Sequence, residues 1–129
     1  MAQMTLLAAA VLTIGLGAVH SWLGEQRLIG PLLSPKNQFG ILAGGFARKI
    51  LRFAWHLTTL AWWGMAAILM ALARSPLGEQ GRMAVLIIAA TVALTGIVIF
   101  VASRGRHLAW PVCWLIAGLA VEPVLHSAP

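Results

Sequence analysis

Four long stretches of the chain are almost free of charged residues, and short polar segments separate them. They cover residues 4–23, 53–73, 83–103 and 108–125. Each has about the twenty apolar residues that a helix needs to cross a bilayer, where every backbone polar group must be bonded within the segment. Short connections make antiparallel neighbours. The pattern therefore predicts an all-α, four-helix transmembrane bundle with up-down-up-down topology, a single integral membrane domain over residues 1–129.

The connecting segments differ in glycine, proline and charge. Residues 24–40 hold two prolines and three glycines, which predicts a loop. Residues 41–52 mix apolar and basic positions, which predicts an amphipathic interfacial segment before the second span. Seven of the nine Lys and Arg residues lie in the first and third connections: Arg27, Lys36, Arg48, Lys49, Arg52, Arg104 and Arg106. The positive-inside rule then predicts that these connections are cytoplasmic and that both termini are not.

Composition supports a membrane protein. Hydrophobic residues make up 60% of the chain and charged residues 9%. A soluble domain of this length could not hide them, because about a third of its surface stays in water. The net charge of +6 would indicate nucleic acid in a soluble protein, but here it lies in loops that suit an anionic lipid surface. We therefore expect the lipid bilayer, and no nucleic acid, as a partner.

The predicted orientation brings three histidines and a carboxylate to one membrane level. His20 lies near the end of the first span, His56 near the start of the second, and His107 just before the fourth, while Glu25 closely follows the first. At 1.5 Å per residue, all four lie within roughly 10 Å of one plane. The expected lipid-interface residues at this level are Arg48, Lys49, Arg52, Trp22, Trp55 and Trp110.

Helical spacing sharpens this prediction. In the second span, Arg52, His56 and Thr59 recur at intervals of three or four residues and share one face. In the first span, glycines lie three residues before and four residues after His20. Glycine leaves room for a neighbouring helix or a flat cofactor to approach closely.

We assign each of these groups an expected role. His56 is the central titrating or ligating group, and His20 is its partner on the neighbouring helix. Glu25 is an acceptor that fixes a histidine tautomer, and Arg52 contacts an anion or lipid. Ionisable groups inside spans are functional candidates by default.

Three functions remain open for this layer. In the first, the protein is an oligomeric subunit that moves or senses a proton, an ion or a small solute. In the second, His20, His56 and His107 bind haem or a divalent metal, because neutral imidazole is the commonest metal ligand. In the third, the protein is an accessory or assembly subunit of a larger membrane complex, and its histidines only make interhelical hydrogen bonds.

Enzymatic chemistry has no motif in this chain. The sequence contains no Gly-rich phosphate loop, no Ser/His/Asp arrangement and no carboxylate dyad, so we expect a non-enzymatic role. The single cysteine, Cys113, excludes an intrachain disulfide. A four-span chain is also too slim to hold a wide pore alone, so transport would require a homo-oligomer.

Three strings carry a resemblance to other proteins. VHSWLGE, RFAWHLTTLAWWG and SRGRHLAWP resemble segments shared by a group of small bacterial four-span membrane proteins. The resemblance implies a bacterial inner-membrane location and no particular function. The chain is also similar in general style to small haem-carrying helical membrane proteins. Small multidrug exporters have a similar size, but they depend on an intramembrane Glu in the first span, and residues 4–23 contain no acid.

Overall fold

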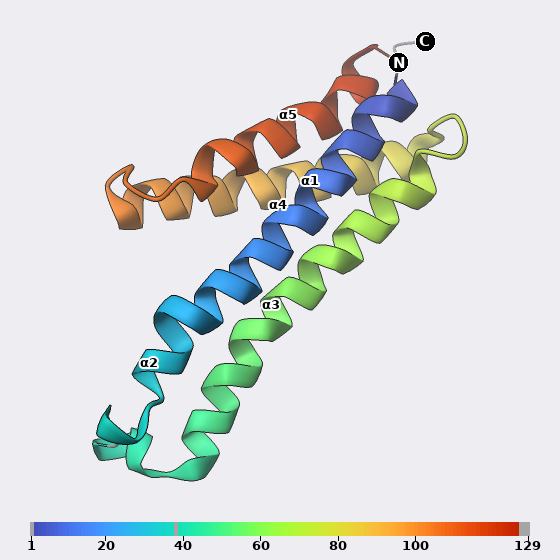
Figure 1. Ribbon diagram of the computed structural model, residues 1–129. Coiled ribbons are helices and arrows are strands. Elements are labelled where there is room, and N and C mark those ends of the chain that lie inside the picture. The colour runs from blue at the N-terminus through green and yellow to red at the C-terminus, as the bar shows by residue number, and fades with distance from the viewer. Residues whose placement is uncertain (1, 38, 127–129) are drawn as a thin grey trace.

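The structure is a computed structural model that describes residues 2–37 and 39–126, and it is almost entirely helical (Figure 1). Its long helices are α1 (Ala2–Gly24), α3 (Gly45–Leu72), α4 (Glu79–Ser103) and α5 (Ala109–His126), and the described residues contain no strand. Four helical segments are long and apolar enough to cross a membrane, the first of them being Gln3–Leu32. The predicted all-α class with four such helices is confirmed.

The first helix continues well past the predicted span. A π-helical turn, η1 (Glu25–Ile29), and a short helix, α2 (Gly30–Leu32), extend it without a break. The Gly30 N–H bonds to the Glu25 carbonyl across the wide π turn, and a Cβ on Gly30 would lie 2.8 Å from that oxygen. Pro31 follows in the first turn of α2, where a missing N–H is tolerated. Part of the predicted loop is therefore helical.

The predicted amphipathic segment is not a separate helix. A 3₁₀ turn, η2 (Pro35–Asn37), and another, η3 (Gly40–Ala43), lead to Gly44, whose backbone is extended. Helix α3 begins at the next residue and runs without interruption to Leu72. The basic residues of this segment therefore occupy the first turns of the spanning helix itself. No proline or glycine follows until Gly64, so nothing breaks the hydrogen-bond ladder.

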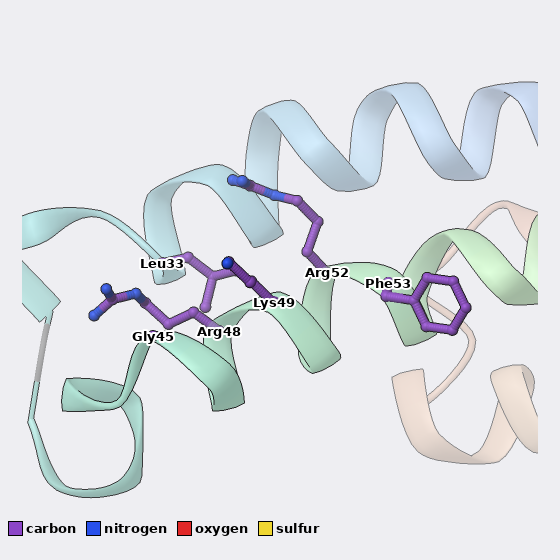
Figure 2. A pocket seen from close by; sticks show the side chains of 6 residues that line it. All are labelled: Leu33, Gly45, Arg48, Lys49, Arg52 and Phe53. Atoms are coloured by element: carbon purple, nitrogen blue, oxygen red, sulfur yellow. The ribbon is translucent and has the colours of Figure 1, made fainter.

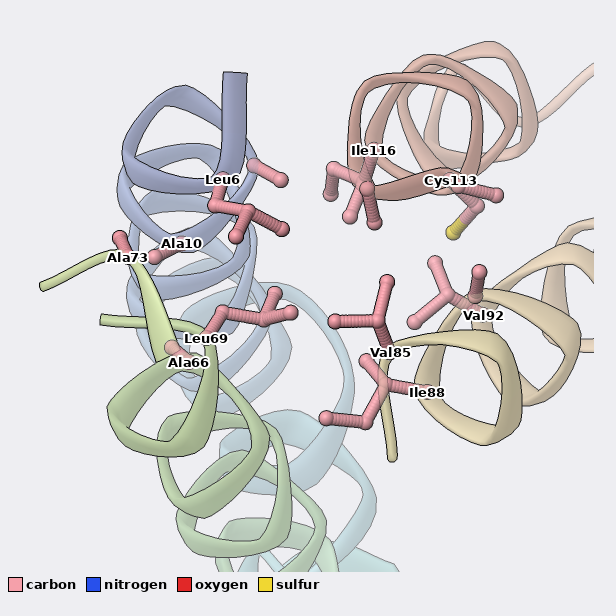
Figure 3. Packing of buried hydrophobic residues seen from close by; sticks show 14 residues of the cluster. Leu6, Ala10, Ala66, Leu69, Ala73, Val85, Ile88, Val92, Cys113 and Ile116 are labelled. Carbon is pink, nitrogen blue, oxygen red and sulfur yellow. The ribbon is translucent and has the colours of Figure 1, made fainter. Parts of the chain in front are cut away.

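The helices pack as two antiparallel pairs that cross obliquely (Figure 1). Helix α1 packs against α3 and α5, and α4 packs against α5, whereas α3 and α4 make little contact. The apolar core lies toward the end of the molecule where α1 begins and α5 ends (Figures 1 and 3). Its members include Leu6, Ala9, Ala10, Ala66, Leu69, Val85, Ile88, Val92, Cys113, Ile116 and Ala120. Many are alanines, which let helix backbones approach closely.

Away from this core, α1 and α3 continue as a two-helix pair beyond α4 and α5 (Figure 1). Large apolar side chains face outward on all sides. Phe53, Leu60, Leu94 and Val98 are each more than half exposed. Such extensive apolar surface is rare on soluble monomers and marks a membrane or partner interface. The two-helix extension carries all of the predicted polar groups except His107, which lies on the turn before α5.

Candidate functional site

A continuous chain of polar contacts links α1 to α3 in this extension. The Ser21 Oγ lies 2.8 Å from the Thr59 Oγ1 and 2.9 Å from the His56 Nδ1. The His56 Nε2 lies 3.3 Å from one carboxylate oxygen of Glu25, and the other oxygen lies 2.9 Å from the Arg52 Nη2. These five residues form what we call the polar chain. The structure thus brings together four of the predicted site residues, with Ser21 as their connector.

The polar chain runs from a buried end to an exposed end. Thr59 is only 3% exposed. The side chains of His56 and Glu25 are 39% and 35% exposed, and that of Arg52 is 51% exposed. On α3 the three members recur at intervals of three and four residues, and Ser21 of α1 lies four residues before Glu25, the first residue of η1. Each set therefore faces the neighbouring helix.

The partners of His56 define its tautomer. An ionised Glu25 can only accept hydrogen bonds, so the neutral imidazole carries its hydrogen on Nε2 and donates it to that carboxylate. The Nδ1 atom is then free to accept the Ser21 hydroxyl hydrogen. The Thr59 hydroxyl has a second partner within reach, because the Gly17 carbonyl lies 3.3 Å from its oxygen and can accept its single hydrogen. Among the described residues, no buried side-chain polar atom is left without a hydrogen bond.

His20 lies beside the polar chain rather than in it. Its ring stacks on the Trp55 indole with centroids 4.4 Å apart and planes 8° apart. The His20 Nε2 lies 3.1 Å from the Thr58 hydroxyl, and Trp62 contacts the same ring at a centroid distance of 5.4 Å. The Trp55 Nε1 donates to the His20 carbonyl at 3.3 Å. Trp55 therefore lies within the helix interface, where it positions His20.

Two glycines of α1 make room for these tryptophans. A Cβ on Gly24 would overlap the Trp55 indole, and a Cβ on Gly17 would lie 2.9 Å from the Trp63 Nε1. The Trp63 Nε1 donates to the Ile14 carbonyl at 3.2 Å. The close approach predicted at these glycines is present, and indole rings from α3 occupy the space.

His107 lies outside the polar chain. It is exposed on the turn before α5, where its Nδ1 accepts the Ala109 N–H at 3.1 Å. Among the described residues, it forms no hydrogen bond to the polar chain. In the described part of the chain, no three His, Cys, Asp or Glu side chains come together as a metal site. The three-histidine metal set stays a prediction.

The remaining predicted interface residues lie at the same end of α1 and α3 or at the α4–α5 turn. Trp22 is 62% exposed on α1. The Trp110 Nε1 donates to the Gly105 carbonyl at 3.2 Å and so ties α5 to the turn before it. Arg48, Lys49 and Arg52 lie in the first two turns of α3.

Sequence reasoning missed Ser21 and Thr58. Ser21 lies four residues after Gly17 and four before Glu25, a spacing that marks one helix face. The residue predicted from the sequence was His20, which lies one residue and about 100° away around the same helix. Helical spacing from Glu25 would have identified Ser21. For Thr58 we find no comparable signal.

No family model, no curated protein and no solved structure matches this chain. The function must therefore be inferred from the chemistry of the site. An imidazole between a carboxylate and a hydroxyl can take up a proton on the nitrogen that faces the hydroxyl and reverse the hydrogen bond made there, while its other nitrogen keeps donating to the carboxylate. The polar chain is suited to registering one proton at the surface and conveying that change into the helix interface.

Proposed function

We propose that this protein is a multi-pass subunit of a bacterial inner membrane that senses protons through the polar chain, with His56 taking up the proton. The observation that carries the proposal is the unbroken run of contacts, 2.8 to 3.3 Å long, from buried Thr59 to exposed Arg52. The basic first and third connections favour a cytoplasmic location for the exposed end. The start of α1 and the end of α5 lie together at the other end (Figure 1), which agrees with both termini being non-cytoplasmic.

Every member of the polar chain has a hydrogen-bond partner both before and after protonation of His56. With neutral His56, Ser21 donates to Nδ1, and Thr59 can donate to Ser21. When His56 is protonated, Nδ1 becomes a donor, so Ser21 must accept from it and turn its own hydrogen to Thr59. The Thr59 hydroxyl is then committed to the Gly17 carbonyl. One proton thus reverses two bonds and strengthens a contact between α1 and α3.

The polar chain ends inside the helix pair, which favours sensing over conduction. Its last acceptor is the backbone carbonyl of Gly17, which cannot pass a proton onward. Further along α1 the interface is the dry core around Leu6 and Leu69, each at most 1% exposed. A cavity between these regions, lined in part by Thr13 and Thr95, has a volume of about 10 Å³. That is the lower limit for a single water.

The haem alternative has less support from the geometry. Both ring nitrogens of His56 already have partners, Ser21 and Glu25. Coordination of iron would require His56 to give up one of these bonds. A proton, by contrast, leaves both partners of His56 in place and changes only the direction in which the Ser21 bond is donated. A sensor of this size passes on its state by changing its contacts with another chain, so an oligomer or membrane-complex partner remains part of the proposal.

The proposal is tested by measuring the α1–α3 distance with two spin labels in nanodiscs. The labels are placed at the exposed positions Gln26→Cys and Ala54→Cys in a Cys113→Ala background. We expect the distance to shorten by roughly 1–2 Å, a typical helix shift, between about pH 8 and pH 5, the range in which histidine changes charge. His56→Gln should abolish the shift. The matched control His107→Gln removes a histidine outside the polar chain and should retain it.

Three results would overturn the sensing proposal. The first is an unchanged distance in the unsubstituted protein, and the second is an unchanged response in His56→Gln. The third concerns conduction. Proteoliposomes containing a pH-sensitive dye should show no proton flux above protein-free vesicles, because the polar chain stops at Gly17. Sustained flux abolished by His56→Gln would make the protein a proton conductor.

A further inference from the structure

A sizeable cavity lies beside the exposed end of the polar chain (Figure 2). Its volume is about 420 Å³, within the range of small-molecule sites. It lies between the first turns of α3 and the loop that follows α2. Its lining residues are Leu33, Gly45, Arg48, Lys49, Arg52 and Phe53. Three of these six are cationic and none is acidic, so the cavity suits an anion.

The three cationic side chains of the cavity differ in the hydrogen-bond and ion-pair partners that they already have. Arg48 is held in place, because its Nη1 donates to the Leu42 carbonyl at 2.9 Å and to the Ala43 carbonyl at 3.4 Å. Arg52 is paired with Glu25. Lys49 has no hydrogen-bond or ion-pair partner among the described residues. One carboxylate thus faces three cations, and two positive charges remain uncompensated.

The start of α3 adds further donors to the cavity. Gly45 is the first residue of the helix and lines the cavity, and no side chain caps this helix end. The N–H groups of a first turn have no partners within the helix and favour negative charge. Backbone donors and basic side chains together are the combination that binds phosphate groups.

The surroundings of the cavity are apolar. Leu33 and Phe53 are part of its lining. Ile41 and Phe46, from the adjoining turn and the start of α3, are about four-fifths exposed. A soluble anion would make no contact with these side chains, whereas the acyl chains of a bound lipid would pack against them. The ligand is therefore expected to be anionic at one end and apolar at the other.

We propose that this cavity binds the phosphate headgroup of an anionic phospholipid. The phosphate contacts Lys49, Arg48 and the first N–H groups of α3, and the acyl chains lie along Phe53 and Leu33. The site also reaches the polar chain through Arg52, since a bound phosphate competes with Glu25 for that guanidinium. This last link rests on the proposed proton-sensing function, but binding of the lipid does not.

Binding is tested by native mass spectrometry of the detergent-purified protein with phosphatidylglycerol or phosphatidylcholine added. We expect a single tightly bound phosphatidylglycerol and much weaker phosphatidylcholine. Lys49→Gln should weaken phosphatidylglycerol binding about fivefold, because it removes one cationic contact with the lipid. The matched control Lys36→Gln removes the same charge from the same connection outside the cavity and should bind as the unsubstituted protein does.

Three outcomes would overturn the lipid site. Equal binding of both lipids would remove the requirement for an anion. An equal loss in Lys36→Gln and Lys49→Gln would show diffuse attraction instead of a site. Displacement of phosphatidylglycerol by inorganic phosphate at equal concentration would identify a soluble anion as the ligand. If lipid binding behaves as expected while the spin-label distance does not respond to pH, only the sensing function fails.

Discussion

Ser21→Ala removes the connector of the polar chain and should destabilise the protein by about 1–2 kcal/mol. The hydroxyl makes two contacts, at 2.9 Å to His56 and 2.8 Å to Thr59. Interhelical hydrogen bonds in membrane proteins average about 0.6 kcal/mol and reach about 1.7. Thr59 keeps its bond to the Gly17 carbonyl, and His56 is partly exposed. Neither partner is therefore left buried without a partner, so the larger penalty for an unsatisfied group does not apply.

The free energy of unfolding is measured by denaturation in mixed micelles, followed by circular dichroism. A double-mutant cycle of Ser21→Ala with His56→Ala isolates the energy of that contact, which should be about 0.5 to 1.5 kcal/mol. Thr91→Ala is the matched control, because the Thr91 hydroxyl bonds only to the Ile87 carbonyl of its own helix. A coupling energy near zero, or an equal loss in the Thr91 variant, would refute the connecting role of Ser21.

The other predictions concern the packing and the charge of the same helix pair. Gly24→Ala places a Cβ into the Trp55 indole and should cost about 1–3 kcal/mol by overpacking. The matched control is Gly15→Ala, where nothing lies within 4 Å of the new Cβ; it should be neutral or stabilising by up to about 1 kcal/mol. Equal effects of the two substitutions on the unfolding free energy would contradict the close approach of Gly24 to Trp55. Arg52→Gln removes a half-exposed ion pair with Glu25 and should change the unfolding free energy by less than about 1 kcal/mol. A loss well above that value in the micelle assay would mean that the pair is shielded from solvent.

The sequence by itself determined the four long helices and the face of α3 that carries the polar groups. Length and hydropathy are local properties, and each apolar stretch of about twenty residues forms its hydrogen bonds within itself. Helical spacing on one element was equally dependable, since Arg52, His56 and Thr59 do share one face of α3. The prediction of where the first helix ends was wrong. The π turn at Glu25–Ile29 extends α1 into α2, although Gly30 and Pro31 of α2 are typical of a loop.

Only the tertiary structure decided which polar groups meet. Apolar residues surround most of each helix, so no polar face indicates which side turns toward a neighbour. The rotation of α1 against α3 placed Ser21 in the polar chain and His20 on Trp55, although the two residues are adjacent in sequence. The oblique crossing of the helix pairs left His107 on the α4–α5 turn, outside the polar chain (Figure 1). Contacts between distant segments depend on packing between helices, and a single sequence does not encode that packing in any local pattern.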